Sequence, residues 1–71
     1  MFKAEIFFPD KKVRKIFEAE DKNLGRASYI IKENNKNIIF KIKAEDISSL
    51  RAALNSITKT LDVYEKTKNV K

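Results

Sequence analysis

The sequence lacks cysteine and histidine altogether and contains a single glycine, Gly25, and a single proline, Pro9. Without cysteine, neither a disulfide bond nor a thiolate metal site can form. Without histidine as well, nucleophilic or general-base catalysis would depend on serine, lysine or carboxylates. These residues are scattered, with no glycine-rich phosphate loop and no carboxylate cluster of the metal-site type. We therefore predict that the chain is not an enzyme and binds no cofactor or metal.

The length of the chain favours self-association. Its 71 residues make one domain, residues 1–71, which is near the lower size limit for a core that folds without additional support. Oligomerisation is the usual remaining source of stability for so small a chain. The apolar runs are too short for a membrane span or a signal peptide. We expect a cytoplasmic protein that makes no membrane contact.

The net charge of +6 is compatible with nucleic acid as a partner. Thirteen of the sixteen basic residues are lysines spread along the chain. Because lysine-rich surfaces often serve solubility alone, charge by itself leaves RNA contact open.

Alternation of apolar and polar residues predicts a half-buried strand over 2–8, with the even-numbered side chains on one face. Pro9 ends this strand, and Asp10 is placed to cap a helix. One face of that helix is predicted to comprise four residues, three of them apolar: Val13, Ile16, Phe17 and Glu20. Residues 21–25 form its exit.

Two further strands are predicted at 26–33 and 38–44, and the second is the most apolar strand of the chain. The intervening residues 34–37 read Asn-Asn-Lys-Asn. This segment is predicted to turn, because asparagine tolerates left-handed backbone conformations and bonds its own backbone. The two strands therefore form a hairpin, and the apolar strand suits the centre of the sheet.

A long helix is predicted after Asp46, which is placed to cap it, and this helix ends near Lys66. Residues 66–71 are expected to be a frayed polar tail. Large apolar side chains recur along the helix at spacings of three and four, forming a seam for the protein's own sheet. The seam comprises Ile47, Leu50, Leu54, Ile57, Leu61 and Tyr64.

The order of elements, β-α-β-β-α, predicts an α+β fold. A right-handed crossover through the first helix leaves a gap between the first two strands, which the third strand fills. We therefore predict a three-stranded antiparallel sheet in the order 1-3-2, with both helices on one face.

A second track on the long helix carries smaller side chains that would let a partner helix approach closely. It comprises Ser49, Ala53, Ser56, Thr60 and Val63. The alternative is that these residues only border the core and that the neighbouring polar track is simply solvated. That polar track includes Arg51 and Asn55.

The outer face of the sheet is the other candidate surface. Phe7, Ile30 and Ile39 would form an apolar patch there, which often marks an interface and here suggests a homodimer. The alternative is an ordinary surface with stray hydrophobic residues. Four lysines surround the patch and could contact RNA backbone: Lys3, Lys32, Lys41 and Lys43. The lack of stacking aromatics makes single-stranded RNA a weaker candidate.

The segment KAEDISSLRAALNS, residues 43–56, resembles the signature of the Pcc family, the small dimerisation subunit of the KEOPS complex. The family pattern is an alanine and an aspartate leading into a helix with Leu-Arg, small residues and Asn-Ser. Phe8-Pro9 after the first strand, Arg26 and Ser28 at the entry of the second, and the lysine-rich hairpin agree with it. The segment 18–24 departs from it, being shorter and more charged than the family's Leu-Ser-Pro-Glu stretch.

This resemblance implies a KH-like fold without the GXXG nucleic-acid loop, since Gly25 stands alone. It also implies a homodimer whose helices dock on the ATPase-fold catalytic subunit of KEOPS and, through it, join the small kinase subunit. The complex makes N6-threonylcarbamoyladenosine (t6A) in tRNA, and the small subunit would assist tRNA binding without catalysing. The expected partner-binding residues are Ser49, Arg51, Ala52, Ala53, Asn55, Ser56 and Thr60.

Three functional alternatives remain open from the residues alone. The chain could be a KEOPS subunit, a stand-alone small RNA-binding domain, or a dimeric adaptor unrelated to tRNA. A paralogous KEOPS subunit of similar fold is a further alternative within the first. A pull-down that recovers an ATPase-fold protein and a small kinase would select the KEOPS interpretation.

Overall fold

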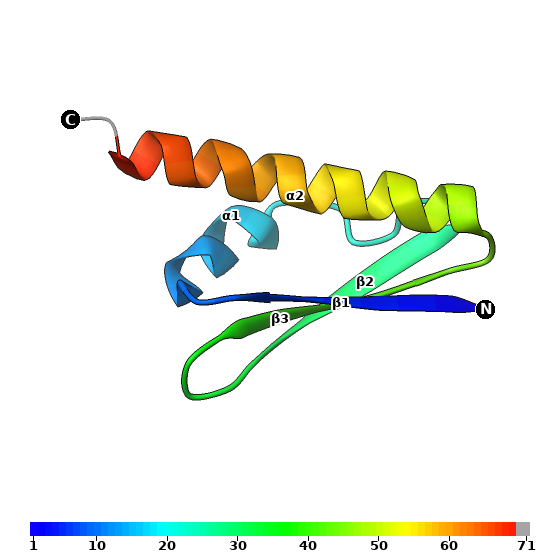
Figure 1. The fold of residues 1–71 in the computed structure, drawn as a ribbon, viewed down its shortest axis with the longest axis horizontal. Coiled ribbons are helices and arrows are strands. Elements are labelled where there is room, and N and C mark those ends of the chain that lie inside the picture. Colours follow the sequence, from blue (N-terminus) through cyan, green and yellow to red (C-terminus); the bar gives the residue numbers. More distant parts are fainter. Residues whose placement is uncertain (70–71) are drawn as a thin grey trace.

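The secondary-structure elements follow one another in the predicted order in the computed structural model, which describes residues 1–69. They are β1 (Phe2–Phe8), the 3-10 turn η1 (Lys11–Val13), α1 (Arg14–Glu18), β2 (Ala27–Glu33), β3 (Ile38–Ala44) and α2 (Ile47–Asn69). The strands form one antiparallel sheet in the order β1-β3-β2. Both helices lie on the same side of this sheet (Figure 1). The predicted α+β fold and strand order are confirmed.

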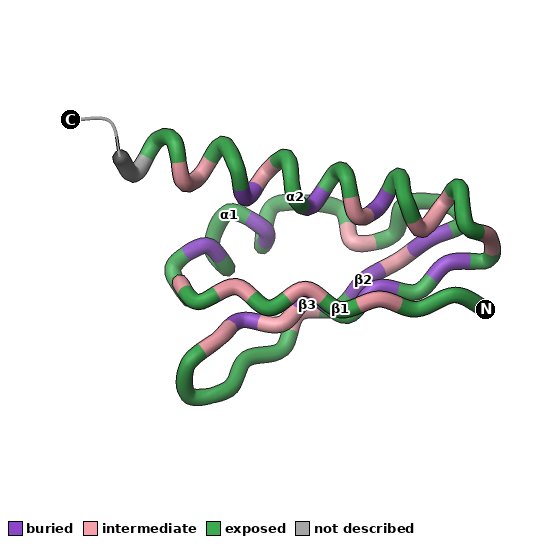
Figure 2. Tube along the Cα trace, viewed as in Figure 1, coloured by how far each residue is buried: buried purple, intermediate pink, exposed green. Residues whose placement is uncertain are grey.

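The core lies between the sheet and α2, where the buried segments of Figure 2 face one another. The inward side chains of β3 are all buried, and Phe40 at its centre is fully buried. Phe17 of α1 packs against Phe40 with ring centroids 4.7 Å apart and an interplanar angle of 64°. Edge-on ring packing of this kind is a favoured aromatic geometry. The core therefore joins the short first helix directly to the central strand.

The first helix is shorter than predicted. It begins as the 3-10 turn η1 and continues as only five α-helical residues, so that Glu20 lies beyond its end. Val13 and Phe17 are buried, but Ile16 is 40% exposed. The prediction of a buried face that includes Ile16 is wrong, because only Val13 and Phe17, four residues apart, reach the core.

The turn between β2 and β3 forms as predicted but by a different backbone conformation. The Asn34 side-chain oxygen accepts hydrogen bonds from the backbone N–H groups of Lys36 at 2.9 Å and Asn37 at 2.7 Å. Gly25 is the only residue with positive φ in the part of the chain that the structure describes. The expected left-handed asparagine is therefore wrong, whereas the expected bonding to the local backbone is confirmed.

The long helix α2 presents a slightly different stripe to the sheet than the predicted seam. Ile57 and Leu61 are buried, and Leu50, Leu54 and Tyr64 are half-buried against the core. Ile47, however, is 49% exposed, and Ala53 is buried in its place. Ala53 lies one turn before Ile57 on the same side of the helix. Its small side chain lets the helix backbone approach the sheet closely.

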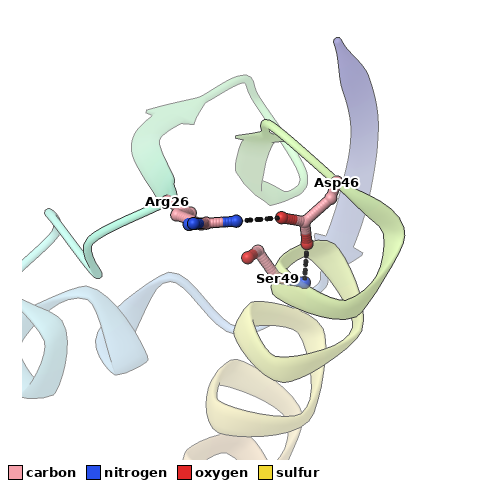
Figure 3. Close-up of polar contacts among 3 residues, drawn as sticks. All are labelled: Arg26, Asp46 and Ser49. Atoms are coloured by element: carbon pink, nitrogen blue, oxygen red, sulfur yellow. Dashed lines mark hydrogen bonds and ion pairs between the residues drawn. The ribbon is translucent and has the colours of Figure 1, made fainter.

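Both ends of α2 are fixed to the rest of the fold. At the start, Asp46 accepts a hydrogen bond from the Ser49 N–H at 2.7 Å and from the Arg26 guanidinium at 3.2 Å (Figure 3). Near the other end, the Tyr64 hydroxyl donates to the carboxylate of Asp10 at 2.7 Å. The helix continues through Asn69, past the predicted end at Lys66, and residues 70–71 of the predicted tail lie outside the described residues.

The carboxyl group of Asp46 is the predicted N-terminal cap. Hydrogen bonds from Ser49 lower its pKa most, and Arg26 lowers the pKa further. A lowered pKa means that the charged form is favoured by folding. The Asp46 carboxylate therefore stabilises the folded chain wherever it is ionised.

Replacing Asp46 by alanine should lower the Tm at neutral pH by roughly 4–8 °C, because the helix start loses its acceptor. The folded-state pKa lies below the unfolded value of about 3.9. The carboxylate therefore stabilises above that pH, and its contribution is lost as the pH falls through the folded-state pKa. Thermal unfolding by circular dichroism should show the Tm difference narrowing below about pH 4.

The matched control for this experiment is Asp46→Asn. Asparagine keeps an acceptor oxygen and is a good N-cap, so this variant should lose less stability than Asp46→Ala. It should also lack the titration below about pH 4, since the amide does not ionise. Equal melting temperatures for the wild type and Asp46→Ala at neutral pH would contradict the capping role.

Candidate functional site

The outer sheet face is the side of the sheet that points away from the helices. The strand register arranges its nine outward side chains in three rows across β1, β3 and β2. The rows are Phe7–Ile39–Lys32, then Glu5–Lys41–Ile30, then Lys3–Lys43–Ser28. All the residues predicted to form the dimer patch and the lysine rim therefore lie on this one face.

The three apolar residues of the predicted dimer patch are neighbours in the sheet. Phe7 lies directly across from Ile39, and Ile30 lies on the diagonal from Ile39. Phe7 is 56% exposed and Ile30 is 53% exposed, whereas Ile39 is half-buried between them. The structure thus brings together a continuous apolar patch that crosses the whole sheet.

The four predicted lysines differ in their surroundings. Lys41 forms an ion pair with Glu5 at 3.7 Å on the neighbouring strand. Lys32 lies across from Ile39 in the apolar row, and Lys3 lies directly across from Lys43 in the last row. The middle of this face is a shallow depression of about 340 Å³ whose lining includes Lys3, Lys41 and Lys43. The lysines therefore do not form a uniform rim around the apolar patch.

The second surface is the small-residue shoulder of α2, which we define as Ser49, Ala52, Ser56 and Thr60. Ala52 and Ser56 are exposed, and Ser49 and Thr60 are half-buried. The Thr60 hydroxyl donates to the Ser56 carbonyl at 3.2 Å. This bond to its own helix occupies the Thr60 hydroxyl, so the small size of the four side chains is the shoulder's main feature.

Ala53 does not belong to this shoulder, although the sequence analysis placed it in the partner-binding track. It is 1% exposed and packs in the core with Ile57 and Leu61. A side chain this buried has no surface for a partner to contact. The expected partner contact by Ala53 is therefore wrong, because tertiary packing turns this alanine toward the sheet.

The expected polar partner residues lie elsewhere on the helix. Arg51 and Asn55 are both exposed. Within residues 1–69, neither side chain forms a hydrogen bond or an ion pair. Arg51 lies about 140° around the helix axis from Ser56, at 3.6 residues per turn. The predicted partner-binding residues therefore occupy two sides of the exposed helix surface.

Two apolar side chains that were expected in the core are exposed on the helical side of the molecule, Ile47 of α2 and Ile16 of α1. Ile16 of α1 was assigned to the core but is 40% exposed. No sequence signal distinguished it from Val13 and Phe17, because the three apolar residues lie within about 100° of one another around the helix axis.

The described residues contain no group of three or more acidic side chains that could hold a metal ion. Among the helices of residues 1–69, none is long and apolar enough to cross a membrane.

Comparison with known proteins identifies the family. No curated protein and no solved structure is similar enough to the chain to match it. A family model described as Transcription factor Pcc1 matches residues 3–69. Because this match covers the fold from β1 to the end of α2, the chain belongs to the Pcc1 family, the family of the KEOPS small subunit.

Proposed function

We propose that the chain is the non-catalytic dimerisation and scaffold subunit of a cytoplasmic KEOPS complex, which makes t6A in tRNA. The family match over residues 3–69 carries this proposal. In it, two copies of the chain pair with each other, and each copy presents α2 to the ATPase-fold catalytic subunit. The small kinase subunit joins through the catalytic subunit, and tRNA binds to the assembled complex.

The arrangement of the two surfaces supports this division of roles. The apolar patch and the small-residue shoulder lie on opposite sides of the fold, because the helices cover one face of the sheet and the patch lies on the other (Figure 1). A chain with two separate surfaces can bind a second copy and a partner at the same time. Simultaneous binding is what a scaffold requires.

The test of the assembly is co-expression of the tagged chain with the ATPase-fold catalytic subunit and the small kinase. Both should be recovered with the chain, and the complex should form t6A on an unmodified tRNA transcript. Failure to recover the catalytic subunit from a folded chain would contradict the scaffold role.

A stand-alone RNA-binding domain is the second candidate function. The positive charge at one end of the outer sheet face favours it, because Lys3 and Lys43 lie opposite each other with no acidic residue between them. This function requires the purified chain alone to bind RNA with a steep salt dependence. An unrelated dimeric adaptor would show neither RNA binding nor recovery of the catalytic subunit.

Phe7→Glu and Ile39→Glu should each weaken the homodimer at least roughly tenfold, because pairing would have to remove the introduced carboxylate from water. Phe7→Glu is the clearer test of the two, because the Phe7 side chain is more than half exposed and contributes less to the core of one copy. Sedimentation equilibrium of each variant against the wild type measures the dissociation constant.

Ile16→Glu is the matched control, because it places the same charge at an exposed isoleucine on the helical side. It should leave the dimer intact. If Ile16→Glu dissociates the dimer and Phe7→Glu does not, the copies pair through their helices. A wild-type chain that is monomeric at micromolar concentration would contradict the dimer itself.

Ser56→Trp should reduce binding of the catalytic subunit at least roughly tenfold, because an indole on the shoulder would overpack a close helix contact. Ser56 is exposed, so the isolated chain should remain folded. Titration of the catalytic subunit by isothermal calorimetry measures the affinity, and circular dichroism checks the fold.

Thr58→Trp is the control for this substitution, since Thr58 is also exposed but lies about 160° around the helix from Ser56. It should leave the affinity unchanged. Loss of binding with Thr58→Trp and not with Ser56→Trp would indicate that the partner binds the side of α2 that carries Arg51.

A further inference from the structure

One carboxylate joins the start of the first helix to a residue near the end of α2. The Asp10 Oδ1 accepts a hydrogen bond from the backbone N–H of Lys12 at 3.0 Å, where η1 begins. The Oδ2 of the same group accepts a hydrogen bond from the Tyr64 hydroxyl at 2.7 Å. Both Asp10 and Tyr64 are half-buried. Two helices that are far apart in the sequence are therefore linked through a single side chain.

The first helix has few attachments of its own to the core. It consists of the three residues of η1 and the five of α1, and its buried side chains are Val13 and Phe17. A helix this short is unstable by itself, because nucleation fixes several residues for each hydrogen bond gained. Two side chains four residues apart lie on one line along a helix, so they leave it free to tilt about that line. The first helix therefore needs further attachments to hold its orientation.

Polar bonds provide such attachments at both ends of the first helix. At its C-terminal end, the Lys22 ammonium donates to the Phe17 carbonyl at 3.0 Å. At its N-terminal end, residues 11–17 contain four basic side chains and no acidic one. Positive charge is unfavourable there, because the free backbone N–H groups of a helix start carry partial positive charge. The start of the first helix therefore depends on the carboxylate of Asp10.

Tyr64 holds this carboxylate from the side of α2. Its ring packs edge-on against Phe8, with ring centroids 6.3 Å apart and an interplanar angle of 73°. Its hydroxyl reaches Asp10, two residues further along the chain. The intervening Pro9 has a fixed φ, and a residue before proline is restricted to extended conformations. Tyr64 thus contacts both sides of a stiff junction between β1 and η1.

We infer that Asp10 is a positioning residue, through which the Tyr64 hydroxyl sets the place of the first helix relative to α2. The consequence for partner binding rests on the proposed function, in which the helical side of the chain faces the catalytic subunit. A surface that is already in place loses less conformational freedom on binding. The bond between Asp10 and Tyr64 therefore raises the affinity for that partner without either side chain contacting it.

Amide hydrogen exchange of the full chain, followed by NMR, tests the link between the two helices. Tyr64→Phe keeps the ring and removes only the hydroxyl. The bonded amides at the start of the first helix, those of Lys12 and Arg14, are the probes. They should exchange roughly tenfold faster or more in Tyr64→Phe, as expected for the loss of a hydrogen bond to a charged group.

Thr58→Val is the matched control, because it also removes one hydroxyl from α2. The Thr58 hydroxyl donates to the Leu54 carbonyl of its own helix at 2.8 Å, so opening of the first helix leaves this bond intact. The same amides should keep the wild-type exchange rate. Equal acceleration by Thr58→Val and Tyr64→Phe would mean that the first helix opens only with the whole fold, which overturns the positioning role. Unchanged exchange in Tyr64→Phe would also overturn it, since the hydroxyl would then hold α2 alone.

A double-mutant cycle tests whether the hydroxyl acts through Asp10. In a chain that already carries Asp10→Ala, the further change Tyr64→Phe should not accelerate exchange of the Arg14 amide, because the acceptor of the hydroxyl is gone. Residues that act as one unit are non-additive in this way. Full additivity of the two changes would overturn the assignment of Asp10 as the positioning residue.

Titration with the catalytic subunit by isothermal calorimetry tests the consequence for partner binding. Tyr64→Phe should weaken binding roughly threefold or more, and Thr58→Val should bind as the wild type does. Weaker binding with unchanged exchange would place the Tyr64 hydroxyl in the interface and overturn the positioning role. Faster exchange with unchanged affinity would overturn the link to partner binding. Failure of the wild-type chain to bind contradicts the proposed function alone, because the exchange measurement uses the chain by itself.

Discussion

The inner face of β3 is the part of the structure on which the rest depends. Ile38, Phe40, Ile42 and Ala44 are all buried, and the same strand pairs along its length with both β1 and β2. A one-residue slip of β3 would move these four side chains to the solvent face. Burial on one face therefore fixes the register, and the register in turn decides which residues meet on the other face.

The packing of α2 depends on this strand in the same way. The helix contacts all three strands, and it is held at its start by Asp46 and near its end by the bond between Tyr64 and Asp10. Two bonded ends and a buried stripe set the rotation of the helix about its axis. This constraint buries Ala53 and leaves Ser56 in solvent. The surface available to a partner is thus a consequence of core packing.

The outer sheet face carries both an apolar patch and exposed lysines, and these two kinds of side chain favour different contacts. Apolar contacts favour a dry interface with a second copy, whereas phosphate contacts depend on exposed positive charge. The strand register places Phe7 and Ile39 at one end of this face and Lys3 and Lys43 at the other, with Ile30 and Lys41 in the row between them.

The sequence by itself determined the elements that rest on local patterns. Alternation located β3 at Ile38–Ala44, and the position of Asp46 before an apolar periodicity located the start of α2. The resemblance of residues 43–56 identified the family. Only the tertiary structure decided the exposure of Ile16, the burial of Ala53 and the pairing of Lys3 with Lys43. These features depend on how each helix is rotated on the sheet and on the register between neighbouring strands, and local sequence periodicity fixes neither.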